Sequence, residues 1–115
     1  MTITLYGIPN CDTVKRARAW LQEHGRDAVF HDFKKAGVPA DRLDAWVAAA
    51  GWERVLNRQG TTWRQLDDAL KASVVDATRA KQVMRDQPST IKRPVVEWAD
   101  GAITVGFDPA DWVKR

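Results

Sequence analysis

Residues 2–18 read TITLYGIPNCDTVKRAR, and they predict a strand that turns sharply into a helix. Thr2–Tyr6 alternates polar and apolar side chains and is rich in β-branched and aromatic residues, which is typical of a strand with one face in a core. Gly7 and Pro9 then interrupt the strand. Apolar side chains follow at helical spacing, namely Val14, Ala17, Trp20 and Leu21. We therefore expect Cys11 at the junction between the strand and the helix.

The position of Cys11 favours an ionised thiol. The first backbone N–H groups of a helix have no partner within the helix, and the helix dipole adds partial positive charge there. Thiols at such places, or beside arginine and lysine, ionise more readily, and the thiolate is the nucleophile. A lone cysteine is otherwise commonly a small buried apolar residue. Because of its turn context, we interpret Cys11 as a reactive thiol.

The size and composition of the chain predict one domain, 1–115, with a single core. The chain has 115 residues, of which 44% are hydrophobic. It contains no apolar run of about 18 residues and no signal-peptide pattern, so we expect a cytoplasmic protein without a membrane span. Its single cysteine cannot form an internal disulfide, which agrees with a reducing compartment. Redox chemistry at Cys11 therefore needs a second thiol from another molecule.

The charge pattern argues against a nucleic-acid-binding surface. The net charge of +3 is spread along the chain, with acidic and basic residues interleaved from Arg42 to Arg85. Such interleaving indicates a solvated surface rather than direct contact with nucleic acid. The two histidines and the cysteine lack metal-ligand spacing, so we expect no metal site. We also expect no bound cofactor.

A second strand is predicted at Ala28–Phe33, after the first helix ends at His24–Gly25. A strand, a crossover helix and a strand of this length form a βαβ unit with parallel strands. His31 lies within the second strand, and we interpret it as a packed strand residue rather than a catalytic base.

A helical insertion is predicted at about 38–88. Residues 34–39 indicate a loop, and a helix follows at 41–50, where apolar residues recur at helical spacing. Residues 52–66 predict two short helical turns on either side of a polar loop. A longer helix then begins with Asp76 as its cap.

The C-terminal part predicts a hairpin and a short helix. Val95–Trp98 and Ile103–Phe107 form the two strands, and Asp100–Gly101 supplies the turn between them. Pro109 then starts a helix that contains Trp112. The predicted fold class is therefore α/β, with a β-α-β half, a helical insertion and a β-β-α half, which is the order of a thioredoxin-like domain.

Three motifs follow one another along the chain. The first is GIPNCDT at Gly7–Thr13 with Lys15 and Arg18, the second is LNRQGTT at Leu56–Thr62, and the third is IKRPV at Ile91–Val95. Together they resemble the ArsC/Spx family of thioredoxin-fold proteins, and most of all its small bacterial YffB-like branch. The resemblance covers essentially the whole chain.

The resemblance implies specific roles for three residues. Cys11 would be the nucleophile, Arg93 a catalytic, anion-binding residue beside it, and Pro94 a cis-proline next to the cysteine. An X-Pro bond is the kind that adopts cis at modest cost. A guanidinium beside the thiol would lower its pKa and bind an oxyanion through two hydrogen bonds. An arginine in a surface loop and a proline that starts a strand are the alternatives.

Two departures from the family pattern narrow the expected chemistry. Arsenate reductases of the family bring three arginines to the oxyanion, and here Arg93 matches one of them. Asn57 occupies the place of a second, with Arg58 next to it, and residues 105–109 contain no arginine. Many Spx regulators carry a Cys-x-x-Cys redox switch. This chain has Val14 where that motif has its second cysteine, so it cannot form such a switch.

A monothiol site therefore remains, with glutathione or a cysteine of another protein as its partner. The YffB-like branch resembles glutathione-dependent thiol reductases, and the same function is implied here. The candidate binding residues for glutathione or an oxyanion are Asn10, Lys15, Arg18, Arg58, Arg93 and Pro94. A solvated helix face is the alternative for Lys15 and Arg18. The competing functions are an Spx-like regulator that binds RNA polymerase and an arsenate reductase.

Overall fold

A computed structural model describes residues 2–115 and shows a mixed α/β architecture. The chain forms two compact units. The first contains residues 2–36 and 93–115, and the second contains residues 37–92. The sheet belongs to the first unit, and the second is helical. The expectation of a single domain, 1–115, stays a prediction, and its residue 1 lies outside the described residues.

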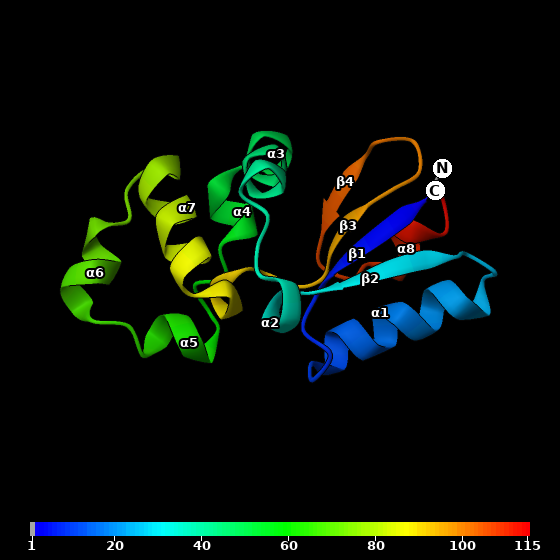
Figure 1. Cartoon of the computed structure of the whole chain (residues 1–115), viewed down its shortest axis with the longest axis horizontal. Helices are drawn as coiled ribbons and strands as arrows, with labels where there is room; N and C mark the ends of the chain where they lie inside the picture. The colour runs from blue at the N-terminus through cyan, green and yellow to red at the C-terminus, as the bar shows by residue number, and fades with distance from the viewer. Residues whose placement is uncertain (1) are drawn as a thin grey trace. The chain divides into compact units, whose positions relative to one another are not determined.

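The first unit is built on one sheet. Within residues 2–115, four strands pair in the order β2-β1-β3-β4 (Figure 1). Their bounds are β1 Ile3–Gly7, β2 Ala28–Asp32, β3 Val95–Glu97 and β4 Ile103–Val105. β1 runs parallel to β2 and antiparallel to β3, and β3 runs antiparallel to β4. The predicted βαβ unit and the C-terminal hairpin are both confirmed.

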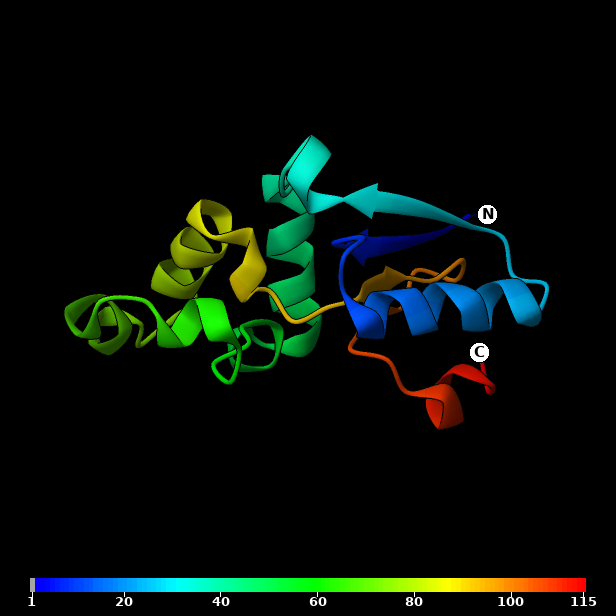
Figure 2. The ribbon, with the colours of Figure 1, turned by 90° about the horizontal axis from the view of Figure 1, so that it is seen from below.

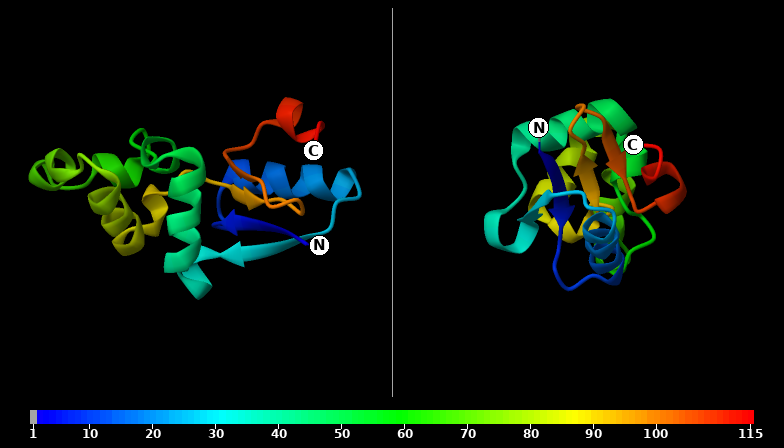
Figure 3. Two further views of the ribbon diagram at one scale, coloured as in Figure 1. Left: turned by 90° about the horizontal axis from the view of Figure 1, so that it is seen from above. Right: turned by 90° about the vertical axis from the view of Figure 1, so that its right-hand side faces the viewer.

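Helices α1 (Asp12–Glu23) and α8 (Pro109–Trp112) cover the same face of this sheet (Figures 2 and 3). The core beneath them consists of Ile3, Leu5, Val14, Ala17, Leu21, Val96, Trp98 and Trp112. Trp112 is fully buried, and its ring centroid lies 4.8 Å from that of Phe107 and 5.0 Å from that of Trp98. The central strands therefore carry α1, and with it Cys11, on a rigid apolar layer.

β1 is covered on both of its faces, which the sequence pattern does not predict. Tyr6 does not belong to the core beneath α1 and is still only 6% exposed. Its ring packs against those of His31 and Phe33, and its hydroxyl donates a hydrogen bond to Glu97 Oε1 at 3.1 Å. A tyrosine fits this place because its ring is buried while its hydroxyl finds an acceptor. His31 is thus a packed strand residue in the structure.

The second unit is a set of short helices. Their bounds are α3 Ala40–Ala50, α4 Trp52–Val55, α5 Thr61–Arg64, α6 Asp68–Ser73, α7 Ala77–Asp86 and the 3-10 helix η1 Pro88–Thr90. α3, α4 and α7 pack together (Figure 1), and Lys81 Nζ on α7 lies 3.0 Å from Asp44 Oδ1 on α3. None of the helices in residues 2–115 has the length and apolar character needed to cross a membrane.

One local expectation is wrong. The predicted loop at 34–39 begins as helix α2, Phe33–Ala36, because the Asp32 carboxylate accepts a hydrogen bond from the N–H of Lys34 at 2.8 Å. The N-cap of α3 is Pro39, which lies just before Asp41. The sequence pattern does not predict α6, because none of the residues of this helix is buried and its sequence therefore shows no apolar stripe.

The helical unit is longer than the predicted insertion at about 38–88, because backbone contacts bind its last residues to α4 and the loop that follows. Leu56 and Ile91 form an isolated antiparallel bridge. The backbone N–H of Asn57 donates a hydrogen bond to the carbonyl of Thr90 at 2.7 Å. The backbone N–H of Lys92 donates one to the carbonyl of Val55 at 2.8 Å. Residues 89–92 are therefore part of this unit.

Removal of the α7 cap tests the helical unit. The Asp76 carboxylate accepts a hydrogen bond from the N–H of Arg79 at 2.9 Å. We expect Asp76→Ala to lower the free energy of unfolding by about 1 kcal/mol, the usual cost of an N-cap. Asp67→Ala is the matched control, because among the described residues the Asp67 side chain makes no capping bond to α6. Urea denaturation measures both variants, and equal losses would contradict the assignment of the cap.

Candidate active site

Cys11 occupies the N-cap of α1. Its backbone is extended, with φ −139° and ψ 121°, and its carbonyl accepts the hydrogen bond from the N–H of Lys15 at 2.9 Å. Its side chain is half-buried and packs against the edge of the apolar core. The sequence predicts this junction correctly because β1, the turn and α1 are all encoded locally.

The surroundings of the thiol lower its pKa. Burial alone would raise the pKa of Cys11, but it is outweighed by a hydrogen bond from the backbone of Val14 and by the hydrogen bond and positive charge of Arg93. The backbone of Thr13 adds a further, smaller lowering. The thiolate is therefore favoured by the first amides of a helix and by one guanidinium, as expected for an activated cysteine.

Sheet pairing brings Arg93 to the thiol. Tyr6 of β1 is opposite Val95 of β3, so the segment just before β3 lies beside the end of β1, where the chain turns toward Cys11. The Arg93–Pro94 peptide bond is cis, as the resemblance implies. Pro94 is buried, and its carbonyl accepts a hydrogen bond from the N–H of Gly106 at 2.8 Å. Arg93 is thus held by ordered backbone on its C-terminal side.

Asn10 and Lys15 flank Cys11 in the chain, and both are exposed. Asn10 lies in the turn before α1, and Lys15 lies in the first turns of the helix. Their positions leave them open to a ligand that approaches the sulfur. Their roles in binding glutathione or an oxyanion stay predictions.

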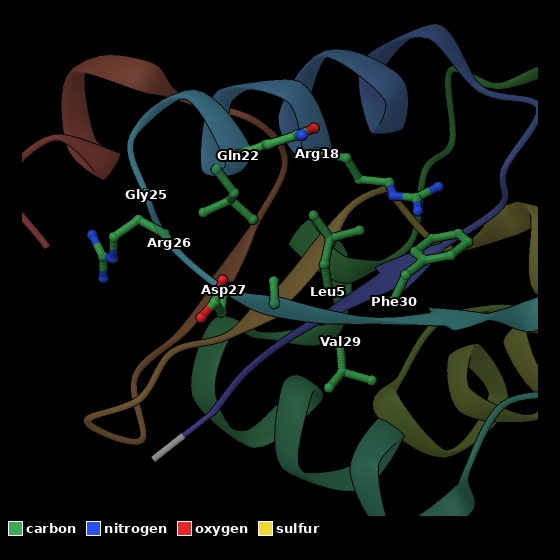
Figure 4. Close-up of a pocket in the computed structure, with 10 residues that line it drawn as sticks. Leu5, Arg18, Gln22, Gly25, Arg26, Asp27, Val29 and Phe30 are labelled. Carbon is green, nitrogen blue, oxygen red and sulfur yellow. The ribbon is translucent and has the colours of Figure 1, made fainter.

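Arg18 lines a cavity of about 280 Å³ between α1 and β2 (Figure 4). Its guanidinium lies over the ring of Phe30, 4.2 Å from the centroid, while Arg26 and Val29 point away from this pair. The sequence does not predict the cavity, because its walls come from α1, the following turn and β2 together. The predicted role of Arg18 in anion binding is not tested by this placement.

Arg58 belongs to the helical unit. Its guanidinium lies 3.6 Å from a carboxylate oxygen of Glu53 and over the ring of Trp52. Next to it, the Asn57 side chain accepts a hydrogen bond from the N–H of Gln59 at 3.1 Å, which closes the polar loop on itself. The predicted role of Arg58 as a ligand for glutathione stays a prediction.

The lowered pKa predicts a pH profile for alkylation by iodoacetamide. A lowered pKa extends the thiolate population to lower pH, so the folded protein should react faster at neutral pH than the same protein unfolded in urea. The midpoint of the rate profile should rise on unfolding, because the helix amides and Arg93 no longer act on the sulfur. Rates measured from pH 5 to pH 10 check this. A midpoint that falls on unfolding would contradict the lowered pKa.

Similarity to known proteins agrees with this architecture. A solved structure of a YffB protein superposes with a TM-score of 0.93 at 49% identity and covers 98% of this chain and 97% of its own. An arsenate reductase related protein from Brucella melitensis is also 49% identical, with a TM-score of 0.77 and coverage of 99% and 93%. The comparison supports the expected YffB-like branch and the ArsC-like thioredoxin fold.

Relatives among curated proteins extend over similar lengths. An uncharacterised protein of Haemophilus influenzae is 39% identical over 110 residues, which is 96% of this chain and 95% of that protein. The global transcriptional regulator Spx of Streptococcus pyogenes is 26% identical and covers 82% of this chain and 70% of its own. The sequence model of the ArsC family matches residues 6–114. Since this match extends over nearly the whole chain, including the cysteine turn and the helical unit, the chain belongs to the ArsC family.

Proposed function

We propose that this protein is a monothiol oxidoreductase in which Cys11 is the nucleophile and glutathione is the co-substrate. The observation that carries the proposal is the half-buried Cys11 thiol, whose pKa is lowered by the N-terminal amides of α1 and by Arg93. The only cysteine in the sequence has no partner thiol in the chain, so the resolving thiol must come from outside. Reduced glutathione is abundant in the cytosol, which is the location that we propose.

The chemistry proceeds by two thiol–disulfide exchanges. The Cys11 thiolate attacks the glutathionyl sulfur of a mixed disulfide R–S–S–G, forms Cys11–S–S–G and releases R–S⁻, which takes up a proton. A glutathione thiolate then attacks the glutathionyl sulfur of Cys11–S–S–G. This step forms oxidised glutathione and regenerates the Cys11 thiolate. Overall, R–S–S–G and one glutathione become R–SH and oxidised glutathione.

Arg93 serves this chemistry in two ways. Its positive charge stabilises the Cys11 thiolate both before attack and when Cys11 leaves the mixed disulfide. Its planar guanidinium can also bind a carboxylate of glutathione through two hydrogen bonds. Asn10, Lys15, Arg18, Arg58 and Pro94 remain our further candidates for contacts with glutathione.

Disulfide reduction is a better candidate than arsenate reduction. Three arginines would be expected around an arsenate, and the chain offers Arg93, with Asn57 in the place of a second and no arginine in residues 105–109. The relative from Brucella melitensis is described as arsenate reductase related. We therefore expect arsenate, supplied with glutathione, to be turned over more slowly than a glutathionylated peptide.

A second candidate is a regulatory role without turnover. It is favoured by the similarity to Spx, a global transcriptional regulator, over 82% of this chain. In this case the protein would bind RNA polymerase, and Cys11 would not be needed for binding. Pull-down with purified RNA polymerase separates the two functions, because the oxidoreductase proposal predicts no retention of polymerase above that of a resin control.

Steady-state turnover tests the proposed function. The substrate is a glutathionylated peptide, the reductant is glutathione, and glutathione reductase with NADPH reports the oxidised glutathione that is formed. We expect a rate proportional to protein concentration that saturates with the peptide. The proposal would be overturned if the folded protein gave no more than the uncatalysed rate and Cys11 did not react with iodoacetamide.

A further inference from the structure

Gly7 ends β1 and faces the first turn of α1 at very short range. A Cβ atom on Gly7 would lie 2.8 Å from Cγ2 of Val14 and 3.5 Å from its Cγ1. Gly7 is not one of the glycines whose φ is positive, so its backbone conformation is open to other residues. The requirement for glycine at this position is therefore one of space.

Val14 cannot easily give way. Its side chain is fully buried and packs in the core with Leu5 and Ala17. A valine in a helix has one strongly preferred χ1 rotamer, so its methyl groups cannot rotate aside at low cost. Because protein cores are close-packed, an added methyl group at residue 7 would move the backbone of the first turn of α1 away from β1.

Val14 lies in the same helical turn that begins at the nucleophile, Cys11. Cys11 is the N-cap of α1, and the backbone of Val14 and Thr13 in the first turn lowers the pKa of its thiol. The side chain of Val14 thus sets how closely the first turn of α1 packs against β1, while its N–H group is one of the amides at the helix start, next to the Cys11 N-cap. A small shift of this turn would move these amides relative to the Cys11 sulfur without removing any side chain from the site.

We propose that Gly7 is a positioning residue, whose lack of a side chain lets Val14 seat the first turn of α1 so that its amides reach the Cys11 sulfur. The inference rests on the proposed function in so far as Cys11 is the nucleophile. Arg93 is the charged side chain that acts on the sulfur among the described residues, and it comes from the segment before β3 rather than from α1. The three heavy atoms nearest to a Cβ on Gly7 all belong to Val14, so the substitution acts first on the α1 turn.

A double-mutant cycle tests the proposal by the pH profile of iodoacetamide alkylation at Cys11. We expect Gly7→Ala to slow alkylation at pH 7 on the order of tenfold, the factor that one hydrogen bond to a charged group supplies. The midpoint of the profile should move to higher pH. Val14→Ala removes both methyl groups that the new Cβ would meet, so Gly7→Ala should cause no further shift on that background.

Val55→Ala is the matched control for lost stability. Val55 is as buried as Val14 but belongs to the helical unit, so its truncation should lower stability and leave the midpoint unchanged. An unchanged midpoint in Gly7→Ala, or an equal shift on the Val14→Ala background, would overturn the proposal. If Gly7→Ala alone does not fold, the double variant Gly7→Ala/Val14→Ala decides. A folded double variant with the alkylation midpoint of Val14→Ala supports the proposal, and an unfolded double variant overturns it.

Alkylation needs no turnover, so the two proposals fail separately. If the double-mutant cycle gives the expected midpoints but glutathione-dependent turnover is absent, Gly7 remains a positioning residue and the oxidoreductase function is refuted. If turnover is normal but Gly7→Ala shifts the midpoint equally on both backgrounds, the oxidoreductase function remains and the role of Gly7 is refuted.

Discussion

Cys11→Ser is expected to reduce glutathione-dependent turnover by at least about a thousandfold, as removal of a catalytic nucleophile does. A serine hydroxyl stays protonated at neutral pH, and neither the α1 amides nor Arg93 can ionise it as they ionise the thiol. The variant also cannot form the mixed disulfide through which the proposed reaction passes. Initial rates with a glutathionylated peptide measure the loss.

The folded state of this variant must be shown alongside its activity. Cys11 is half-buried and the exchange of sulfur for oxygen is small, so we expect the thermal midpoint to stay close to that of the parent. Thr78→Ser on the exposed face of α7 is a suitable control and should keep full activity. Turnover in Cys11→Ser above a tenth of the parent rate would refute the catalytic role of Cys11.

Arg93→Met is expected to lower turnover on the order of a hundredfold, similar to the loss of one preorganised donor from a site of developing charge. The variant removes the hydrogen bond and the positive charge that lower the pKa of Cys11. The alkylation profile should therefore move to higher pH, and the KM for glutathione should rise. Arg93→Lys retains the charge but not the planar pair of donors, so it should restore the pH profile more fully than the KM.

Lys92→Met is the matched control for Arg93→Met. It removes the same charge from the neighbouring residue, whose side chain is exposed. Turnover and the alkylation profile of this variant should remain those of the parent, because a solvated charge has little effect on a distant group at physiological salt. Equal effects of the two substitutions would show that net charge, and not the placement of Arg93, governs the site.

The elements that sequence reasoning predicts well are those encoded locally. The strand, the turn and the helix around Cys11 follow from residues 2–18, and the structure places Cys11 at the N-cap of α1. The cap at Asp76 and the turn before Ile103 also depend on neighbouring residues alone. In each of these places the local chemistry of caps and turns agrees with the tertiary packing.

The features that sequence reasoning does not predict depend on packing between distant segments. The second buried face of β1 requires rings from β2 and α2 against Tyr6. The contact between Gly7 and Val14 is visible only when β1 and α1 are placed together. The approach of Arg93 to Cys11 is an intermediate case, because the family resemblance implies it but the β1·β3 register supplies its physical cause.

The activation of Cys11 is tested most directly by the rate at which oxidised glutathione glutathionylates it at pH 7, followed by intact-protein mass spectrometry. We expect the folded protein to gain one glutathionyl group faster than the same chain unfolded in urea, and Arg93→Met to lose most of this advantage. A folded protein that reacts no faster than its unfolded chain would contradict the claim that the helix amides and Arg93 activate Cys11 for disulfide exchange.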